Sequence, residues 1–514
     1  MFRKLLIANR GEIALRVIRT ARVLGIRSVA VFSEVDADAP HVWLADEAVP
    51  VGPAPAAESY LNAQALLAAA RSTGAEALHP GYGFLSENAE FARAVEEAGL
   101  TFVGPAPATL EAVGEKTVAR RRMQAAGVPV VPGSDGALQD AADALRVARE
   151  VGWPVLLKPA GGGGGKGMRR VDGPHELERE YAAAAREAEK GFANPTLYLE
   201  RHLGRVRHLE VQILGTGGGV VALGVRECSI QRRHQKVIEE TPSPVTAGRD
   251  RGAECHELAE RLLEAARRAG EAVGYRNAGT VEFLLDATGR IHFIEVNARL
   301  QVEHPVTELV TGLDLVEAQL RIAAGESLPA SFLRPDPRGW ALEVRVCAED
   351  PARGFLPATG IVRRLRLPSG PGLRWDGGIE DGSVVTAHYD SLLGKLCAWG
   401  PDRAAALARL VGGLAELRIE GVTTNVDFLA RVLGDPAFCA GELHTGFVEE
   451  RAESLLRPRP EAPELLAVAA VLGLEGGAAG NGGRHAAGAS GFASAGAEVP
   501  SRWRSERPPF VWIR

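Results

Sequence analysis

The chain has 514 residues, of which 46% are apolar, and a formal net charge of −6. One hydrophobic core cannot serve a chain of this length, so we expect about three domains. The charge balance without a basic run argues against nucleic-acid binding, and the lack of a signal peptide or of an apolar run of membrane length predicts a cytoplasmic protein that does not bind membranes.

The first 115 residues show alternating strand and helix patterns. Residues 4–8 form a short apolar run, 13–24 have helical spacing, and 28–32 form a second apolar run. A strand, a helix and a strand in this order predict a parallel sheet with helices on its faces, as in a Rossmann-like domain.

A loop rich in glycine and aromatic residues follows another strand pattern. Residues 80–88 read Pro-Gly-Tyr-Gly-Phe-Leu-Ser-Glu-Asn, directly after the strand predicted at 75–79. Open α/β sheets bind ligands beyond the carboxyl ends of their strands, so the loop is a candidate ligand contact. For Gly81 and Gly83 alone, a tight turn without a ligand is the simpler interpretation.

Residues 116–203 resemble a separate small lobe with a mobile glycine-rich lid. The five glycines 161–165 lie between Lys158 and Lys166, and their amides could fold over phosphates. The segment is not a Walker A loop, because Gly167 stands where that motif requires Ser or Thr. A flexible linker is the alternative, but the flanking lysines favour a phosphate lid.

A dense basic segment follows a strand pattern at 220–225. Residues 226–236 contain four Arg and Lys residues and one His. They are Arg226, Arg232, Arg233, His234 and Lys236. Either this segment binds an anion, or it is an ordinary solvated charge run.

The segment 293–308 has the most informative pattern. From Glu295 to Glu303 every odd position is polar and every even position is apolar, which predicts an extended chain with one polar face. That face carries carboxylate, guanidinium and amide groups, a set able to hold a metal ion and an oxyanion together. Its members are Glu295, Asn297, Arg299, Gln301 and Glu303.

A second strand, 279–286, precedes this segment and contains Glu282. A two-residue turn at Thr288–Gly289 would place Glu282 directly opposite Glu295. Two facing carboxylates repel each other, and a divalent cation such as Mg²⁺ or Mn²⁺ would relieve that repulsion. The alternatives are a longer turn with another register, or one glutamate exposed at a sheet edge.

The C-terminal part again mixes strands and helices up to about residue 448. In the strand pattern 340–346, Arg345 faces the same side as Glu343. Residues 475–501 are rich in Gly, Ala and Ser, which is typical of a flexible linker.

Lysine is rare in this chain. Only seven of the 59 basic residues are Lys, so each remaining Lys is a candidate for a position that needs a compact ammonium group. They are Lys4, Lys116, Lys158, Lys166, Lys190, Lys236 and Lys395. Chance retention explains Lys4 and Lys190 equally well.

Five segments together resemble the biotin carboxylase component of biotin-dependent carboxylases, an ATP-grasp enzyme. They are residues 7–14, 79–88, 158–168, 227–240 and 293–308. The match is collinear over roughly residues 1–449, and the tail is similar to the linker that follows this component in acyl-CoA carboxylase α chains. Two departures, Lys166 in the glycine loop and the hinge Glu200-Arg-His-Leu203, leave the implied chemistry intact.

The resemblance implies an α/β fold and four parts. These are an N-terminal domain (1–115), an ATP-grasp domain (116–335) with a lid at about 132–203, a C-terminal α+β domain (336–448) and a low-complexity tail (449–514). It also implies a role for each matching residue. The implied ATP contacts are Lys116, Lys158, Gly164, Gly165, Met168, Glu200, Leu203, His208, Gln231 and His234. The implied metal ligands are Glu282, Glu295 and Asn297, for two Mg²⁺ or Mn²⁺ ions. The implied bicarbonate site is Lys236, Arg299, Gln301, Val302 and Glu303, and the implied biotin contacts are Arg345 and Tyr82.

The same resemblance implies ATP-dependent carboxylation of biotin by bicarbonate through carboxyphosphate, with Glu303 as general base. It further implies a biotin carboxyl carrier domain in trans, a carboxyltransferase partner and a homodimer. The family's carrier is modified on a Lys between two Met residues, and here Met1, Met123 and Met168 have no adjacent Lys. The alternatives are another ATP-grasp ligase that activates a carboxylate, or an inactive nucleotide-binding subunit.

Overall fold

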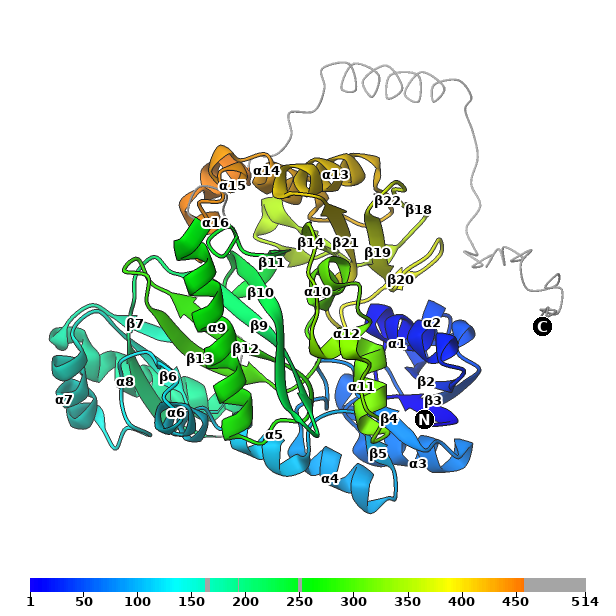
Figure 1. Cartoon of the computed structure of the whole chain (residues 1–514), viewed down its shortest axis with the longest axis horizontal. Coiled ribbons are helices and arrows are strands. Elements are labelled where there is room, and N and C mark those ends of the chain that lie inside the picture. The colour runs from blue at the N-terminus through cyan, green and yellow to red at the C-terminus, as the bar shows by residue number, and fades with distance from the viewer. Residues whose placement is uncertain (162–166, 193, 248–251, 457–514) are drawn as a thin grey trace, which may run out of the picture. The chain divides into compact units, whose positions relative to one another are not determined.

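The structure is a computed structural model that describes residues 1–161, 167–192, 194–247 and 252–456 (Figure 1). The expectations for Gly164, Gly165 and Lys166, and for the tail from residue 457, lie outside the described residues. Within the described part, no helix combines the length and apolar character needed to cross a lipid bilayer.

The N-terminal residues form the parallel sheet that the sequence predicts. Its strands run in the order β3-β2-β1-β4-β5, and all neighbouring pairs are parallel. Leu5, Leu6 and Ile7 of β1 have no exposed surface, as expected for a central strand covered by helices on both faces. The strands are β1 (Lys4–Ile7), β2 (Arg27–Ser33), β3 (Glu47–Gly52), β4 (Ala77–His79) and β5 (Thr101–Phe102). The helices are α1 (Gly11–Val23), α2 (Pro40–Leu44), α3 (Ala63–Thr73) and α4 (Ala89–Glu97).

Local sequence signals set several helix ends in this part. The side chain of Asn62 accepts a hydrogen bond from the backbone N–H of Ala65 at the start of α3. Gly74 ends the same helix with φ = 67°, a left-handed conformation that glycine adopts without steric strain. Two further helices, α5 (Pro107–Gly114) and α6 (Lys116–Ala125), lead out of the domain, and α6 packs against β13.

A three-stranded sheet and two helices form the small lobe. The strand order is β7-β6-β8, with α7 and α8 packed on each other and against the strands (Figure 1). These elements are α7 (Ala141–Val151), β6 (Val155–Pro159), β7 (Arg169–Val171), α8 (Pro174–Phe192) and β8 (Leu197–Arg201). Leu157, Leu197 and Leu199 are fully buried, so the lobe has an apolar core of its own.

The largest sheet has eight strands in the order β13-β12-β9-β10-β11-β14-β21-β19. Every neighbouring pair is antiparallel. The five strands of this sheet that come first in the sequence are β9 (Arg207–Thr216), β10 (Gly219–Arg232), β11 (Gln235–Thr241), β12 (Asn277–Leu285) and β13 (Ile291–Asn297). The others are β14 (Trp340–Cys347), β19 (Leu373–Gly377) and β21 (Leu392–Gly400). Because β11 pairs with β14, one continuous sheet joins the segment that contains Lys236 to the segment that contains Arg345.

Helices cover this sheet. Helix α9 (Gly252–Ala272) packs against β9 and β10, and α10 (His304–Thr311) packs against β14 (Figure 1). The remaining helices are α11 (Leu315–Ala323), α12 (Ala330–Leu333), α13 (Arg403–Glu416), α14 (Val426–Leu433), α15 (Pro436–Cys439), α16 (Phe447–Glu450) and α17 (Ala452–Leu455). Short strands complete the part after residue 348, namely β15 (Glu349–Asp350), β16 (Leu356–Pro357), β17 (Gly360–Ile361), β18 (Arg364–Arg366), β20 (Val384–Val385) and β22 (Arg418–Glu420).

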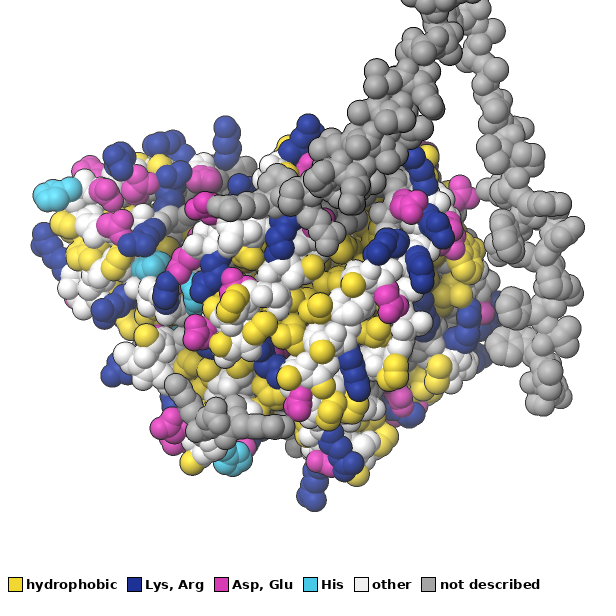
Figure 2. All heavy atoms as spheres, turned by 90° about the horizontal axis from the view of Figure 1, so that it is seen from above, with side chains coloured by type: hydrophobic (Ala, Val, Ile, Leu, Met, Phe, Trp, Pro, Cys, Tyr) yellow, Lys and Arg dark blue, Asp and Glu magenta, His cyan; other side chains and the backbone are white. Residues whose placement is uncertain are grey.

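One face of the molecule is shown with all its atoms in Figure 2. Basic and acidic side chains are interspersed over the described residues of that face, with apolar side chains between them. The described residues thus form the expected α/β architecture, with a parallel N-terminal sheet, a small lobe and a large antiparallel sheet.

Candidate active site

One cleft of about 1280 Å³ collects nearly all the described candidate residues. Residues from the N-terminal loop, the small lobe and the large sheet all line it. The candidates in its wall are Tyr82, Lys116, Lys158, Met168, Glu200, Leu203, His208, Gln231, His234, Lys236, Glu282, Glu295, Asn297, Arg299, Gln301, Val302 and Arg345. Glu303 lies behind the wall, where it has no exposed surface and contacts Lys236 and Arg345.

Glu282 and Glu295 face each other across β12 and β13, as the sequence predicts. The predicted turn is nevertheless wrong, because near the loop the pairing is Leu285 with Ile291. The loop has three residues, with Gly289 at φ = 78°, and Asp286 accepts hydrogen bonds from the backbone N–H of Thr288 and Arg290.

A β-bulge restores the expected register. The pairing shifts by one residue between Glu282 and Phe283, because Ile294 is an extra residue on β13. Beyond the bulge Glu282 pairs with Glu295 and Thr280 with Asn297. The error in the turn and the bulge cancel at the two glutamates.

The extended chain expected through Glu303 ends earlier, at Asn297. The chain leaves the sheet there because α10 begins at His304, with Pro305 in its first turn and Glu303 as its N-cap residue. Ala298 and Leu300 remain buried. The apolar side chains after Asn297 therefore still pack into the core although this part of the chain is not a strand. Arg299 is held in the cleft wall by Glu87, whose carboxylate accepts from Arg299 Nε at 3.0 Å.

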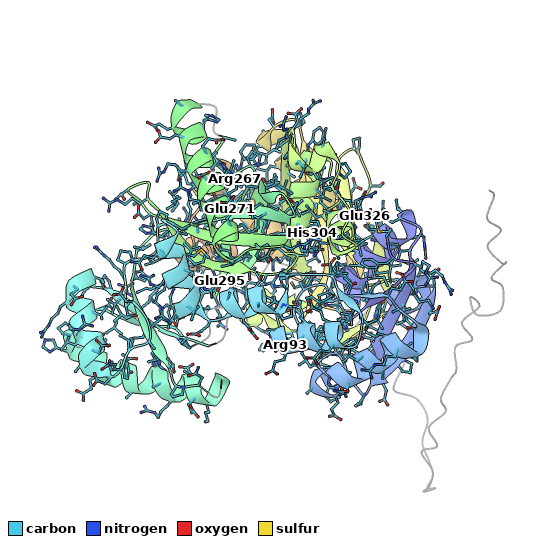
Figure 3. All side chains as sticks on the ribbon, turned by 60° about the horizontal axis from the view of Figure 1, so that its bottom comes forward. Arg93, Arg267, Glu271, Glu295, His304 and Glu326 are labelled. Carbon is cyan, nitrogen blue, oxygen red and sulfur yellow. The ribbon has the colours of Figure 1, made fainter. Side chains whose placement is uncertain are left out.

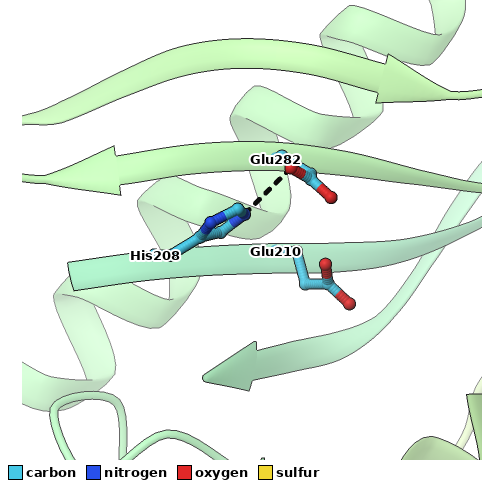
Figure 4. A group of neighbouring side chains, drawn as sticks. All are labelled: His208, Glu210 and Glu282. Carbon is cyan, nitrogen blue, oxygen red and sulfur yellow. Dashed lines mark ion pairs between the residues drawn. The ribbon is translucent and has the colours of Figure 1, made fainter. Parts of the chain in front are cut away.

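A lysine and a histidine lie against Glu282. Its carboxylate accepts from Lys236 Nζ at 2.6 Å and pairs with His208 Nε2 at 2.9 Å. Burial raises the pKa of Glu282, but the charges of Lys236 and His208 outweigh burial and lower that pKa. Figure 4 shows His208 pointing from β9 toward Glu282 on β12, with Glu210 beside it on β9. The sequence of the hairpin indicates a metal ion at Glu282 but neither of these two neighbours, because both come from other strands.

Glu295 has a different environment. Its side chain reaches into the cleft, and Lys116 Nζ lies 3.2 Å from its carboxylate. Figure 3 shows Glu295 on the side of the large sheet that faces the small lobe. Asn297 donates from Nδ2 to Glu282 at 2.8 Å, so its side-chain amide lies beside the same carboxylate pair. Two carboxylates and an amide oxygen at one cleft wall are a donor set that fits Mg²⁺.

Lys236 is the centre of the buried charges. Its ammonium donates to Glu282 at 2.6 Å and to Glu303 at 2.8 Å, and it also contacts Glu210. Burial lowers the pKa of Lys236, yet the three carboxylates raise it well above its ordinary value. An ammonium with three donors suits this arrangement, in which one cation joins three acceptors.

Glu303 lies between two cations. Lys236 holds one oxygen and Arg345 Nη2 donates to the other at 3.0 Å. Burial raises the pKa of Glu303, but the charges of Lys236, Arg345 and Arg226 hold it well below its ordinary value. Glu303 is therefore an ionised carboxylate, able to accept a proton.

The basic segment 226–236 is not a single anion site. Arg226 is fully buried and donates to Gln212 at 2.7 Å and to Thr280 at 2.8 Å. The guanidinium carbon of Arg232 lies over the ring of Phe355, 4.3 Å from the ring centroid. His234 and Lys236 line the cleft, at and after the β10–β11 turn.

The candidates for nucleotide contact lie along the side of the cleft nearest the small lobe. Lys158 of β6 forms an ion pair with Glu200 of β8, and Arg120 Nη1 donates to Glu200 at 3.2 Å. Gln231 Nε2 and His208 Nδ1 are 2.7 Å apart. The lysine, carboxylate and amide groups thus line one wall, while Leu203 and Met168 add apolar surface.

Several residues of this site were missed by the sequence analysis. Glu12 accepts from the Tyr82 hydroxyl and pairs at 3.0 Å with Lys395, which also donates to the carbonyl oxygen of Val302 at 2.8 Å. The rarity of Lys could have pointed to Lys395, which is fully buried. Glu87 lies in the loop 80–88 that the sequence analysis selected, but no pattern marked it individually.

Three family models together match most of the chain up to residue 450. The family model "Biotin carboxylase, N-terminal domain" matches residues 1–110, and "Biotin carboxylase C-terminal domain" matches residues 343–450. Between them, "Carbamoyl-phosphate synthase L chain, ATP binding domain" matches residues 115–331.

Two curated relatives and one solved structure show the extent of the likeness. The biotin carboxylase of Halalkalibacterium halodurans is 49% identical over 87% of this chain and 97% of its own length. The α subunit of mitochondrial methylcrotonoyl-CoA carboxylase from Oryza sativa is 50% identical over 89% of this chain, which spans 62% of that longer protein. The biotin carboxylase domain dimer of the Hydrogenobacter thermophilus 2-oxoglutarate carboxylase, solved with MgADP, ADP and bicarbonate, has a TM-score of 0.84 and 43% identity over 90% of this chain and 100% of that one.

Proposed function

This chain belongs to the biotin carboxylase family, and on that premise we propose that its cleft carboxylates biotin with bicarbonate in an ATP-dependent reaction in which the residues below have separate roles. The observation that carries the proposal is the position of Glu303. Its buried carboxylate lies between Lys236 and Arg345, close to the pair Glu282 and Glu295. A general base, an anion holder and a nucleotide-metal site are thus adjacent.

Glu303 is proposed to remove the proton of bicarbonate. Its pKa is held low by the charges of Lys236 and Arg345 beside it. A bicarbonate anion that draws on the charge of Lys236 would raise the pKa of Glu303, because a nearby negative charge disfavours an ionised carboxylate. Substrate binding then makes Glu303 a stronger base at the step that needs one.

Bicarbonate is proposed to bind between Lys236 and Arg299. Both cations line the cleft, and Gln301 and Val302 lie beside Arg299. Arg299 already donates to Gln301 Oε1 at 3.0 Å, so its guanidinium is oriented before substrate enters. Fixed donors of this kind align a weak nucleophile with the γ-phosphate.

ATP is proposed to occupy the wall formed with the small lobe. Lys116 and Lys158 would contact phosphate oxygens, with the glycine loop folding over them. The further contacts proposed for ATP are Gly164, Gly165, Met168, Glu200, Leu203, His208, Gln231 and His234. Glu282, Glu295 and Asn297 would hold two Mg²⁺ ions, which neutralise phosphate charge when bound.

Biotin is proposed to bind beside Arg345 and Tyr82. Carboxyphosphate, formed from bicarbonate and the γ-phosphoryl group, breaks into CO₂ and phosphate. Phosphate then takes the N1′ proton of biotin, and N1′ bonds to the carbon of CO₂. Arg345 would stabilise the negative charge that develops on the ureido oxygen.

The proposed assembly has further members. We place the domain boundaries at 1–115, 116–335, 336–448 and 449–514, with the lid at about 132–203. Biotin would arrive on a carrier domain in trans, a carboxyltransferase subunit would use the carboxybiotin, and the chain would act as a homodimer. The Oryza sativa relative is longer than the matched part and is named as one subunit of a carboxylase, which supports further members of the assembly.

The test is ADP release by the purified chain with Mg²⁺ and ATP. We expect it to require bicarbonate and to rise when free biotin is added. An ATP-grasp ligase of another kind would respond to a different carboxylate and show no biotin stimulation, and an inactive nucleotide-binding subunit would release no ADP.

A further inference from the structure

Two glutamates lie side by side behind Arg345, without direct contact with the cleft. Glu239 of β11 is directly opposite Glu343 of β14 in the sheet register, and both side chains have no exposed surface. Glu343 is in turn opposite Cys397 of β21. Neither glutamate has a role in the chemistry proposed above.

Each glutamate has one bonded oxygen and one oxygen without a partner. Glu239 Oε1 accepts from Arg345 Nε at 2.6 Å, and Glu343 Oε2 accepts from the Cys397 thiol at 3.2 Å. Glu239 Oε2 and Glu343 Oε1 are buried and have no hydrogen-bond donor among the described residues. A buried acceptor without a donor is costly, and two in facing residues need a common explanation.

A single shared proton satisfies both oxygens. Two ionised carboxylates that face each other in a buried site repel each other strongly, so one holds a proton, as in other carboxylate pairs. Burial raises the pKa of Glu343 well above its ordinary value; the charge of Lys395 acts against burial, and the charge of Glu239 adds to it. Burial also raises the pKa of Glu239, to about 7, with Arg345 acting against it. Glu239 pairs directly with Arg345 and so stays the anion, whereas the bonded oxygen of Glu343 has only the Cys397 thiol, and the proton therefore belongs to Glu343.

We propose that Glu343 is a neutral carboxylic acid that donates its proton to Glu239 Oε2 and thereby positions Arg345. Glu239 stays an anion, and its other oxygen holds Nε of Arg345. The guanidinium is then fixed with Nη2 toward Glu303 and its remaining face toward the cleft. Glu343 is a positioning residue that acts through Glu239, and this inference rests on the proposed role of Arg345 in biotin binding.

The same substitution at the two positions gives opposite expected results. In E343Q the amide is neutral and still donates, so the KM for biotin should stay within about twofold of the wild type. In E239Q the anion that holds Arg345 is lost, so the KM for biotin should rise about tenfold or more, while the KM for ATP changes less. E271Q, an exposed change on α9, is the matched control (Figure 3).

Infrared spectroscopy tests the proton directly and needs no turnover. The wild type should show the carbonyl stretch of a buried carboxylic acid, and this band should disappear in E343Q. The shared proton would be contradicted if the KM for biotin rose equally in E343Q and E239Q. It would also be contradicted if the carbonyl band of the wild type remained in E343Q. Failure of the proposed function is distinguishable, since it would appear as wild-type ADP release that does not respond to biotin.

Discussion

Glu282 and Glu295 lie opposite each other on adjacent strands, yet different side chains contact them. Lys236 and His208 contact Glu282 from within the sheet, whereas only Lys116, at 3.2 Å, approaches Glu295 among the described residues. Glu282 is thus held in place by the protein, and Glu295 faces the cleft. This asymmetry makes Glu295 the better probe of the metal site.

E295Q is expected to weaken activation by Mg²⁺ while the fold is kept. Gln removes the charge that attracts the cation, and the apparent affinity for Mg²⁺ should fall at least about tenfold. Titration of ADP release with Mg²⁺ at saturating ATP measures this. E271Q on the surface of α9 should match the wild type, and an unchanged Mg²⁺ dependence in E295Q would remove Glu295 from the metal site.

E303Q is expected to bind ATP but to lose bicarbonate-dependent turnover. Gln cannot accept the proton, and general-base catalysis usually contributes about 10² or more to the rate. ATP affinity, measured by binding in the absence of bicarbonate, should remain close to that of the wild type because Glu303 does not line the nucleotide wall. Turnover within a few-fold of the wild type would contradict the assignment of the base.

The sequence could predict the pair Glu282 and Glu295 because a hairpin is local, and alternation alone identifies its faces. It could not predict the groups that contact Glu282, because only the folded sheet brings β9 with His208 beside β12 and places β11 with Lys236 two strands beyond β9. The end of β13 at Asn297 was missed for a related reason. Apolar and polar positions still alternate after Asn297, but the N-terminus of α10 decides where the strand stops.

The buried groups around Arg345 were also beyond sequence reasoning. Glu239 and Glu343 are 104 positions apart in the printed sequence and meet only through the β11–β14 pairing. Lys395 is a partial exception, because the scarcity of Lys marked it as a candidate without saying what it contacts.

Acidification below pH 7 is expected to raise the KM for biotin. Burial raises the pKa of Glu239 to about 7, so below that pH Glu239 gains a proton and Arg345 loses one of its two anionic partners. The KM should be nearly constant above about pH 7.5 and should approach a tenfold rise per unit at lower pH. The charged groups that act on Glu239 are Arg345, Glu303 and Lys236.

E239Q tests this pH dependence. Without the titrating carboxylate, the KM for biotin should be high but independent of pH over the same range. If E239Q kept the wild-type rise below pH 7, another group would be responsible.

K395M is expected to destabilise the protein strongly. Lys395 is fully buried, pairs with Glu12 at 3.0 Å and donates to the carbonyl oxygen of Val302. Removing one member of a buried ion pair costs about 3–5 kcal/mol, because the other charge is left without compensation. Thermal unfolding should therefore shift down in K395M, and the double variant E12Q/K395M should recover part of the loss.

K190M is the matched control for K395M. Lys190 lies exposed on α8, and its replacement should change unfolding by less than about 0.5 kcal/mol. If K395M had the same unfolding temperature as K190M, the ion pair between Lys395 and Glu12 would not contribute to stability.

The chain is expected to use biotin without carrying it covalently. A carrier needs an exposed Lys whose side chain is free to extend away from the protein. Most described Lys residues instead form ion pairs: Lys116 with Glu295, Lys158 with Glu200, and Lys236 and Lys395 with buried carboxylates. Lys4 donates to the Thr73 carbonyl oxygen and pairs with Glu47 at 2.9 Å. Lys190 is exposed but lies within the regular helix α8.

Mass spectrometry of the chain produced with an active biotin ligase should find the unmodified mass, with a separate biotinylated carrier domain as the positive control. That carrier domain should also be carboxylated faster than free biotin, and covalent biotin on any of the seven Lys residues would contradict delivery in trans.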